Sequence, residues 1–333
     1  MFTLILPHST PSRIFETLRR HEGFHTVRRS NPNFAIAASL AFAIFLWGGN
    51  NTGTKWLVQS WPPVVTGSTR FICAGLLLAG LLRWTNLFGP SAPITADTRR
   101  RLWLRGGLTL AAYIVCFNWA LRFTSASHVA LYLGASPVWA LLWEERPAKS
   151  LRSLRLYGAA ALALAGVITL FWPALHNAKT SLPGEALGLI GSVLWTVYGR
   201  ESRALGNLLP GADVAAQTMW RAGILLIPLA VVETIMSPVM PCTMAMLGVQ
   251  LYCVVAGGVV AFGIWTNSLR HWPASRVLLF NNLIPLSTMT WAHFCLGEPV
   301  TQTFWIAMSL IVAGVILGQS DLLLRPKRIC PPE

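Results

Sequence analysis

Long apolar segments alternate with short polar connections along most of the chain. A transmembrane helix needs about 20 apolar residues to cross a hydrocarbon core of about 30 Å, whereas a strand of a transmembrane barrel needs only about ten alternating residues. The apolar segments are close to the first length and therefore predict an all-α integral membrane protein. The ten predicted helices span residues 34–54, 63–83, 103–122, 125–143, 156–174, 185–204, 213–236, 243–268, 275–296 and 302–324.

Part of this pattern occurs twice, at an offset of 148 residues. The stretch ASHVALYLGASP at residues 126–137 corresponds to ASRVLLFNNLIP at residues 274–285. Trp47 and Trp195 keep the same offset, as do the Ala-Gly-Val-Ile sequences that follow each copy. Each copy would hold five helices, an odd number, so the second would enter the membrane from the opposite side. We therefore predict two five-helix inverted-topology repeats, an arrangement that suits alternating access around a site near the midplane.

The composition supports a membrane protein and changes how the positive charge is interpreted. The 333 residues are 54% hydrophobic and 11% charged, against about 25% charged in a soluble domain. The net charge of +14 would suit nucleic acid if Lys and Arg clustered on a soluble face. They lie instead at the ends of the apolar segments. We expect a small-molecule substrate and the lipid bilayer as partners, and no nucleic acid.

Basic residues are divided unevenly between the two predicted membrane faces. The tails and the connections after the even-numbered segments carry 21 of them, whereas the other face carries Lys55, Arg122 and Lys179. Cytoplasmic connections of membrane proteins are enriched in Lys and Arg. The sequence therefore predicts a multi-pass protein of the plasma (inner) membrane with both termini in the cytoplasm.

This pattern divides the chain into five parts. Residues 1–32 form a basic cytoplasmic N-terminal tail, residues 33–174 the first repeat, residues 175–184 an outer linker, residues 185–324 the second repeat and residues 325–333 a cytoplasmic C-terminal tail. The sequence leaves open whether residues 1–32 are disordered, form an amphipathic surface helix or arise from a start codon upstream of the true one.

Polar side chains within the predicted helices are candidates for contact with a solute, because they are costly in a membrane unless they face a cavity or a partner. An amide can equally join two helices, and a tryptophan can lie in the interfacial belt. An aromatic and amide lining suits a neutral or zwitterionic solute with an apolar part. The candidate substrate-binding residues are Trp47, Asn50, Asn118, His128, Tyr132, Trp195, Tyr198, Trp265, Asn267, Asn281 and Asn282.

Two prolines and two arginines also lie within predicted helices. Pro137 and Pro285 occupy equivalent positions, and each removes one backbone hydrogen bond, so each helix should kink or loosen there. The pair is either a gating hinge or a packing kink. Arg70 and Arg221 lie near a membrane face by length, and they are expected to extend their charged ends toward that face. Binding of a substrate carboxylate is the less favoured alternative for these two residues.

Several chemistries have no support in this sequence. The six cysteines form no Cys-x-x-Cys pair, so neither a zinc site nor a thioredoxin-type site is indicated. There is no phosphate-binding Gly-x-x-x-x-Gly-Lys-Ser/Thr loop, Gly-x-Ser-x-Gly elbow or His-Glu-x-x-His motif. No acidic residue falls in the middle of a predicted helix, which leaves His128 as the titratable candidate. We expect no enzyme activity, no cofactor and no metal site.

The repeated stretches resemble EamA-type permeases of the drug/metabolite transporter superfamily over about residues 34–324. The resemblance implies a ten-helix permease for small metabolites, with the first, third and fourth helices and their repeats around the cavity. One departure is that the Gly-Glu pair of the second half, Gly297-Glu298, has Ser150 at the matching first-half position. The likeness is carried by Ala120–Ala130, Pro137 and Ala165-Gly166-Val167 in the first half, and by Ser268–Ser275, Pro285 and Leu296-Gly297-Glu298-Pro299 in the second.

We therefore expect a secondary transporter that moves an amino acid or amphipathic solute by alternating access, and by resemblance we favour export. The alternatives are an importer or sugar-conjugate carrier of the same fold, or a non-transporting membrane scaffold or accessory subunit. A carrier should show a continuous polar cavity from one face to near mid-depth, and a scaffold a dry, filled centre. The sequence leaves open the substrate, the coupling ion and the choice between monomer and homodimer.

Overall fold

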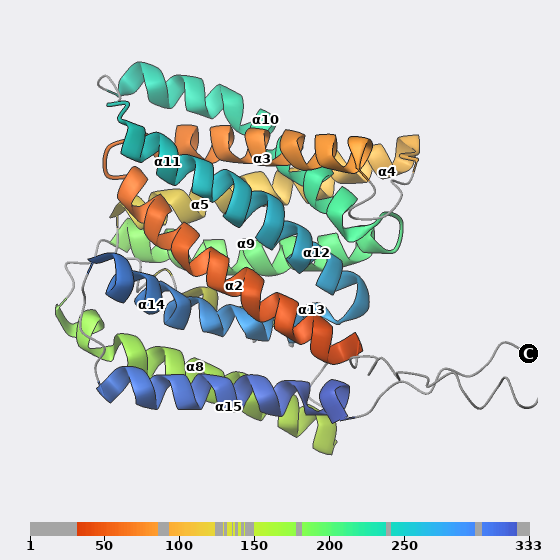
Figure 1. The fold of residues 1–333 in the computed structure, drawn as a ribbon, viewed down its shortest axis with the longest axis vertical. Helices are drawn as coiled ribbons and strands as arrows, with labels where there is room; N and C mark the ends of the chain where they lie inside the picture. The colour runs from red at the N-terminus through yellow and green to blue at the C-terminus, as the bar shows by residue number, and fades with distance from the viewer. Residues whose placement is uncertain are drawn as a thin grey trace, which may run out of the picture.

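A computed structural model of the chain describes residues 32–85, 93–123, 150–177, 182–237, 241–296 and 302–324, together with positions 129, 132–134, 136, 139, 140 and 143. All regular structure in these residues is helical (Figure 1). Most of the fourth predicted segment and nearly all of the two predicted tails lie outside the described residues. The elements are α2 (Pro32–Leu57), α3 (Pro63–Trp84), α4 (Ala96–Arg101), η1 (Leu102–Gly107), α5 (Leu108–Phe123), α8 (Leu151–Asn177), α9 (Leu182–Gly206), α10 (Gly211–Met236), α11 (Met244–Tyr252), η2 (Cys253–Ala261), α12 (Phe262–His271), α13 (Ala274–Leu279), η3 (Phe280–Leu283), α14 (Ile284–Leu296) and α15 (Gln302–Leu324).

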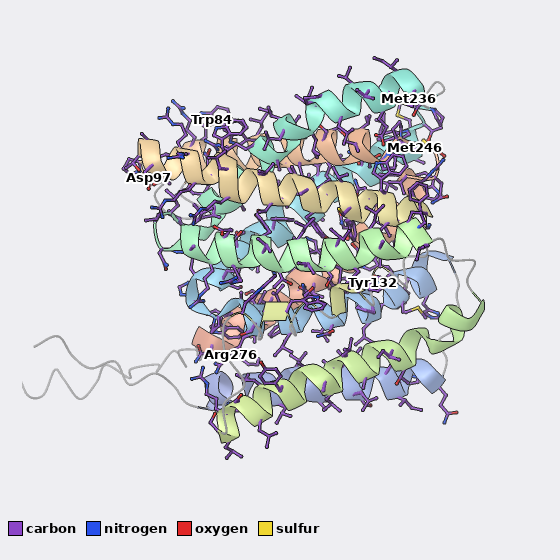
Figure 2. All side chains as sticks on the ribbon, turned by 180° about the vertical axis from the view of Figure 1, so that it is seen from behind. Trp84, Asp97, Tyr132, Met236, Met246 and Arg276 are labelled. Atoms are coloured by element: carbon purple, nitrogen blue, oxygen red, sulfur yellow. The ribbon has the colours of Figure 1, made fainter. Side chains whose placement is uncertain are left out.

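The predicted segments that fall on described residues form helices, and their ends differ from the prediction by at most seven residues. Large apolar side chains such as Trp84 and Met236 are exposed near opposite ends of the bundle (Figure 2), as expected of a surface that lipid covers. The all-helical membrane fold is therefore confirmed. The described helices that are long and apolar enough to cross a membrane are Asn33–Leu57, Pro63–Trp84, Ala96–Phe123, Gly211–Met236 and Met244–His271.

The most extensive contact between helices joins α3 of the first half of the chain (residues 32–177) to α10 of the second half (residues 182–324). A Cβ on Gly75 would overlap the backbone nitrogen of Trp220, and a Cβ on Gly223 would lie 2.8 Å from the backbone nitrogen of Ile72. Gly75 and Gly223 are 148 residues apart, as are Ile72 and Trp220. The same close contact is thus made twice, with the roles of the two helices exchanged.

The pair α8 and α15, at the edge of the bundle, packs in the same reciprocal way (Figure 1). A Cβ on Gly166 would lie 2.9 Å from the carbonyl oxygen of Ala307, and a Cβ on Gly314 would lie 2.9 Å from that of Ala159. These residues are again related by the offset of 148. Because only glycine allows such an approach, the glycines set the separation of the two helices.

Basic side chains join helix ends at one end of the bundle. Lys55 Nζ, in the last turn of α2, donates a hydrogen bond to Leu121 O of α5 at 2.6 Å. Arg122 Nη1 donates in return to Val58 O, just after α2, at 2.6 Å. Cations near helix C-termini are favourable because they satisfy free carbonyls and interact with the helix dipole.

The second half makes the corresponding pair of hydrogen bonds at the opposite end of the bundle (Figure 1). Arg203 Nη1 of α9 donates to Leu269 O of α12 at 3.2 Å, and Arg270 Nε donates to Gly206 O at 2.9 Å. Each donor and each acceptor lies 148 residues after its counterpart in the first half. The two halves therefore share the same connections between their helix ends.

The third and eighth predicted helices each contain a π-helical stretch, η1 between α4 and α5 and η2 between α11 and α12. A glycine in each stretch lies against the other half of the chain. A Cβ on Gly106 would lie 2.5 Å from Thr218 Cγ2 of α10, and a Cβ on Gly258 would lie 2.5 Å from Ala74 Cβ of α3. π-Helical turns are rare overall, but those that occur are often found at functional sites. The stretch η2 contributes to the cavity described below.

The predicted loosening of the helix at Pro285 is present. A 3₁₀ turn, η3, separates α13 from α14 immediately before this proline. Pro285 has no N–H to donate to the carbonyl of Asn281, and the N–H of Ile284 donates there instead. Pro137 lies outside the described residues.

Candidate functional site

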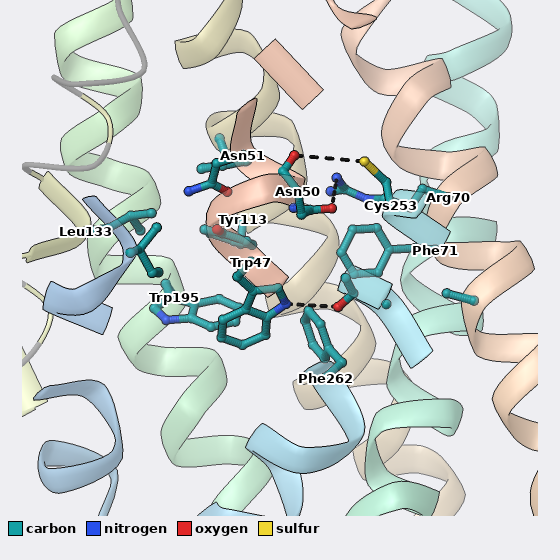
Figure 3. Close-up of a pocket in the computed structure, with 15 residues that line it drawn as sticks. Trp47, Asn50, Asn51, Arg70, Phe71, Tyr113, Leu133, Trp195, Cys253 and Phe262 are labelled. Carbon is teal, nitrogen blue, oxygen red and sulfur yellow. Dashed lines mark hydrogen bonds between the residues drawn. The ribbon is translucent and has the colours of Figure 1, made fainter. Parts of the chain in front are cut away.

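A small cavity lies at the centre of the bundle, between α2, α3 and α5 of the first half and α9, η2 and α12 of the second (Figure 3). Its wall combines aromatic rings with polar side chains from both halves. The aromatic residues are Trp47, Phe71, Tyr113, Phe117, Trp195 and Phe262, and the polar residues are Asn50, Asn51, Arg70 and Cys253.

The cavity measures about 40 Å³. A single water needs about 10–15 Å³, whereas ligand pockets begin at about 300 Å³. The cavity therefore has room for a few waters and none for a metabolite, so this conformation is closed around its centre. Among the described residues, the central cavity is not the expected continuous polar cavity from one face to mid-depth, and its wall is not lined only by apolar groups either.

The aromatic wall is built on contact between two tryptophans from the two halves. The ring centroids of Trp47 and Trp195 lie 5.4 Å apart with an edge-to-face geometry. Trp47 Nε1 donates a hydrogen bond to Gly257 O of η2 at 2.9 Å. Phe262 packs edge to face against both indoles, with centroids 5.4 Å and 5.9 Å away. Edge-to-face packing of this kind fixes the rings in defined positions.

Arg70 provides the positive charge of the wall. Its side chain is only 4% exposed, and its Nη1 donates to Thr54 Oγ1 at 2.8 Å and to Asn50 Oδ1 at 3.3 Å. The guanidinium also lies 4.7 Å from the centroid of the Phe71 ring. The prediction that Arg70 extends toward a membrane face is therefore wrong, because the packing of α3 turns this residue toward the cavity.

Arg221 is likewise buried, yet it takes no part in the cavity. Its Nη1 donates to Gln217 O at 2.8 Å within α10, and the guanidinium lies 4.1 Å from the Trp220 ring and 5.4 Å from the Trp103 ring. The side chain is thus held by its own helix and two indoles. The two predicted intramembrane arginines have different surroundings, and only Arg70 faces the site.

Of the predicted substrate-binding residues, Trp47, Asn50 and Trp195 line the cavity. Tyr198 and Trp265 form a layer behind Trp195, because Trp265 stacks on Trp195 with centroids 4.6 Å apart and Tyr198 stacks on Trp265 at 5.8 Å. Both residues of this second layer are fully buried. They support the wall of the closed site and do not form its surface.

Asn118 joins two helices in place of lining the cavity. Its Nδ2 donates to Pro63 O at the start of α3 at 2.8 Å. Thr266, 148 residues later, donates to Gly211 O at the start of α10 at 2.7 Å. The alternative considered for the amides, a hydrogen bond between helices, applies to Asn118.

Asn267 and Tyr132 are not brought to the cavity. Asn267 follows the buried Thr266 by one residue, a rotation of about 100° around the helix, and its side chain is exposed. This part of the prediction is corrected. Tyr132 is half-buried and packs against α9, where a Cβ on Gly188 would lie 2.7 Å from its Cδ2.

Asn281 and Asn282 are buried in the 3₁₀ turn before Pro285. Asn282 Nδ2 donates to Leu279 O at 3.1 Å. Among the described residues, no hydrogen-bond partner is found for either amide atom of Asn281 or for Asn282 Oδ1. Ile284, one residue after this turn, lines the cavity. His128 lies outside the described residues.

Some of the wall residues outside the candidate substrate-binding set carry a recognisable sequence signal. Arg70 carries a charge inside an apolar segment, which is a functional signal in membrane proteins. Tyr113 and Phe262 lie on the third and eighth helices, which were expected to line the cavity. Phe71 and Phe117 are ordinary apolar residues of membrane helices, and no sequence feature separates them from residues that face lipid.

A helical membrane protein with a closed, partly polar site between two halves has the organisation of a transporter. The profile of the EamA-like transporter family matches residues 34–172 and residues 182–318. The chain belongs to this family, so the predicted likeness is confirmed. The protein is a membrane transporter and not an enzyme.

Relatives of similar length carry transporter names. An uncharacterized transporter of Archaeoglobus fulgidus is 25% identical over 84% of this chain and 95% of its own length. The uncharacterized inner membrane transporter YedA of Escherichia coli K12 is 25% identical, with 83% and 88% covered. A probable amino-acid metabolite efflux pump of Salmonella typhimurium is 24% identical, with 83% and 91% covered. A crystal structure with 19% identity superposes with a TM-score of 0.69 over 89% of this chain and all of the other, so it shares the fold.

Proposed function

We propose that this protein is a secondary transporter that moves a small metabolite by alternating access. The observation that carries the proposal is the closed cavity between the two halves, where Trp47 of one half touches Trp195 of the other. The cavity is too small for a metabolite, so a solute can enter only when the halves separate on one side. A central site between two movable halves is what alternating access requires.

We propose ten transmembrane helices in two inverted repeats, residues 33–174 and 185–324, with residues 175–184 as the outer linker. The reciprocal contacts of Gly75 with Gly223's helix, and of Gly166 with Gly314's helix, support this proposal. A contact that occurs twice with exchanged roles is expected where an approximate twofold axis relates the halves. The proposed orientation in the inner membrane has both tails on the cytoplasmic side. In that orientation the Lys55–Arg122 pair lies at the outer face and the Arg203–Arg270 pair at the cytoplasmic face.

The 3₁₀ turn before Pro285 is proposed as the hinge of one gate, with Pro137 as its counterpart. Leaving a buried polar atom without a partner costs about 1–3 kcal/mol, and Asn281 and Asn282 have such atoms in the closed state among the described residues. Movement at this turn would bring water or solute to these amides. The closed state thus carries a cost that opening relieves.

An amino acid or another amphipathic solute is the proposed substrate, and export is the proposed direction. The aromatic and amide wall suits such a solute, and the name of the Salmonella relative is that of an efflux pump. Within this proposal Trp47, Asn50 and Trp195 contact the solute directly. Tyr198 and Trp265 hold Trp195 in place, and His128 is a proposed contact from the fourth helix.

Transport by proteoliposomes tests the proposal. Purified full-length protein is reconstituted, and uptake and release of a panel of amino acids and amines are measured in both directions. Movement of at least one solute is expected, and it should be lost in Asn50→Ala. Asn267→Ala removes an exposed amide outside the cavity and is the matched control. If folded protein moves no member of the panel, the alternative of a non-transporting scaffold or accessory subunit gains the support that the carrier loses.

A further inference from the structure

Arg70 is a cation enclosed within the wall of the central cavity (Figure 3). With 4% of the side chain exposed, the guanidinium has lost most of its contact with surrounding solvent. A buried charge of this kind is strongly unfavourable unless an anion or a full set of acceptors compensates it. The group that compensates the charge of Arg70 therefore has to be identified.

The described polar groups around the guanidinium include no carboxylate. They are the hydroxyl of Thr54, the amide oxygen of Asn50, the thiol of Cys253 and the phenol of Tyr113. The ion pairs that join Arg101 to Asp97 and Arg105 to Glu201 do not involve Arg70. No aspartate or glutamate is found among the described residues of the cavity wall. The described part of the protein thus leaves the charge of Arg70 without an anion.

Glu233 of α10 is a buried carboxylate at the start of α3, and its hydrogen bonds are made there. Its Oε2 accepts hydrogen bonds from the backbone N–H groups of Val64 at 2.7 Å and Val65 at 3.1 Å, in the first turn of α3. Arg70 follows Val64 by six residues, which is about 9 Å along a helix axis. The carboxylate of Glu233 therefore caps the helix and does not neutralise Arg70.

We propose that the missing anion is supplied by the substrate, and that the transporter is selective for solutes that carry a carboxylate on an apolar or aromatic body. This inference rests on the transport function proposed above. The planar guanidinium matches a carboxylate with two parallel hydrogen bonds. The bond from Arg70 to Asn50 is the longer of its two recorded bonds, at 3.3 Å, and it is the one that a carboxylate would replace.

The rest of the wall determines what the carboxylate is attached to. Trp47, Trp195 and Phe262 present an apolar surface beside Arg70. An α-amino group is tolerated, because ring faces attract ammonium groups. A solute whose only charge is positive is excluded, since it meets Arg70 and, among the described residues of the wall, no carboxylate to oppose that charge.

Three probes with the same ring separate these classes: 3-phenylpropionate with a carboxylate only, phenylalanine with both groups and 2-phenylethylamine with an ammonium only. Binding to the purified full-length protein in detergent is measured by isothermal titration calorimetry. We expect saturable binding of the two carboxylates and none of the amine. Arg70→Gln should weaken carboxylate binding roughly thirtyfold or more, as for removal of one partner of a buried charge pair.

A second variant is designed to retain the fold. Asn50→Asp places a carboxylate where Arg70 already donates a hydrogen bond, so it gives the guanidinium a permanent partner. We expect this variant to melt at a higher temperature than the wild type and to lose carboxylate binding. Asn267→Asp makes the same chemical change at an exposed position, and its binding should match the wild type.

The outcomes separate this inference from the transport proposal. Binding of the amine as tightly as the carboxylates, undiminished carboxylate binding by folded Arg70→Gln, or absence of saturable binding by both carboxylates would overturn it. If proteoliposomes move the amine and neither carboxylate, transport stands and the inference fails. If the carboxylates bind in an Arg70-dependent way and no solute is moved, the anion site stands and the transport proposal fails.

Discussion

Trp47 and Trp195 touch each other edge to face at 5.4 Å, yet only Trp47 is fixed by a hydrogen bond from its indole nitrogen among the described residues. The acceptor is Gly257 O, in the π-helical stretch η2. Two residues at equivalent positions of the two halves are therefore held differently. Trp47 is anchored to the backbone of the opposite half, whereas Trp195 is held by the stacked ring of Trp265.

Trp47→Phe should destabilise the protein more than Trp195→Phe. Both variants keep an aromatic ring, but only the first removes a buried hydrogen bond, and such a bond is worth about 1 kcal/mol. Melting temperatures of the two purified variants in the same detergent measure the difference. Equal melting temperatures would contradict a structural role for the Trp47 hydrogen bond.

Glu233→Gln should destabilise the start of α3. The helix begins after Pro62, which offers no side-chain cap, and the charge of Glu233 interacts favourably with the two N–H groups there. Loss of such a cap costs about 1–2 kcal/mol, and unfolding in denaturing detergent measures it. Glu201→Gln is the control, because Glu201 lies in a partly exposed pair 3.8 Å from Arg105, which is worth less than about 1 kcal/mol. Equal losses of stability in the two variants would contradict a capping role for Glu233.

Alanine at Gly75 or Gly223 should force α3 and α10 apart. At both positions a Cβ would meet backbone atoms of the facing helix, and overpacking of this kind costs about 1–3 kcal/mol. Gly248→Ala is the matched control, because no atom lies within 4 Å of its Cβ position, and alanine there gains helix propensity of about 1 kcal/mol. The prediction is wrong if all three variants shift the melting temperature in the same direction.

The basic pairs at the two ends of the bundle should control access from opposite sides. Cys253 lines the closed cavity and is fully buried, so in a variant lacking the other five cysteines it reports opening. Arg122→Ala should speed its labelling by an impermeant thiol reagent added outside, and Arg270→Ala its labelling from inside. Arg83→Ala, at an exposed arginine, is the control. Faster labelling from the same side in both variants would contradict the placement of the two pairs at opposite membrane faces.

The sequence predicted the helices well and the site only in part. Helix positions follow from the length of apolar segments, a property of the chain alone. Which side of a helix faces the cavity depends on its rotation against its neighbours, and the close contact of Gly75 with α10 contributes to that rotation for Arg70. A one-residue change in phase separates the buried Thr266 from the exposed Asn267, and polarity alone cannot resolve it.

The hydrogen bonds of Glu233 have a consequence for how such a chain can evolve. The acid is encoded in the second half, whereas the helix it completes is encoded in the first. The position 148 residues earlier is Thr85, whose hydroxyl donates to Leu81 O in its own helix. A gene reduced to its first half would encode a helix with an unfinished start. A dependence of this kind makes two halves encoded in one gene hard to separate into two working proteins.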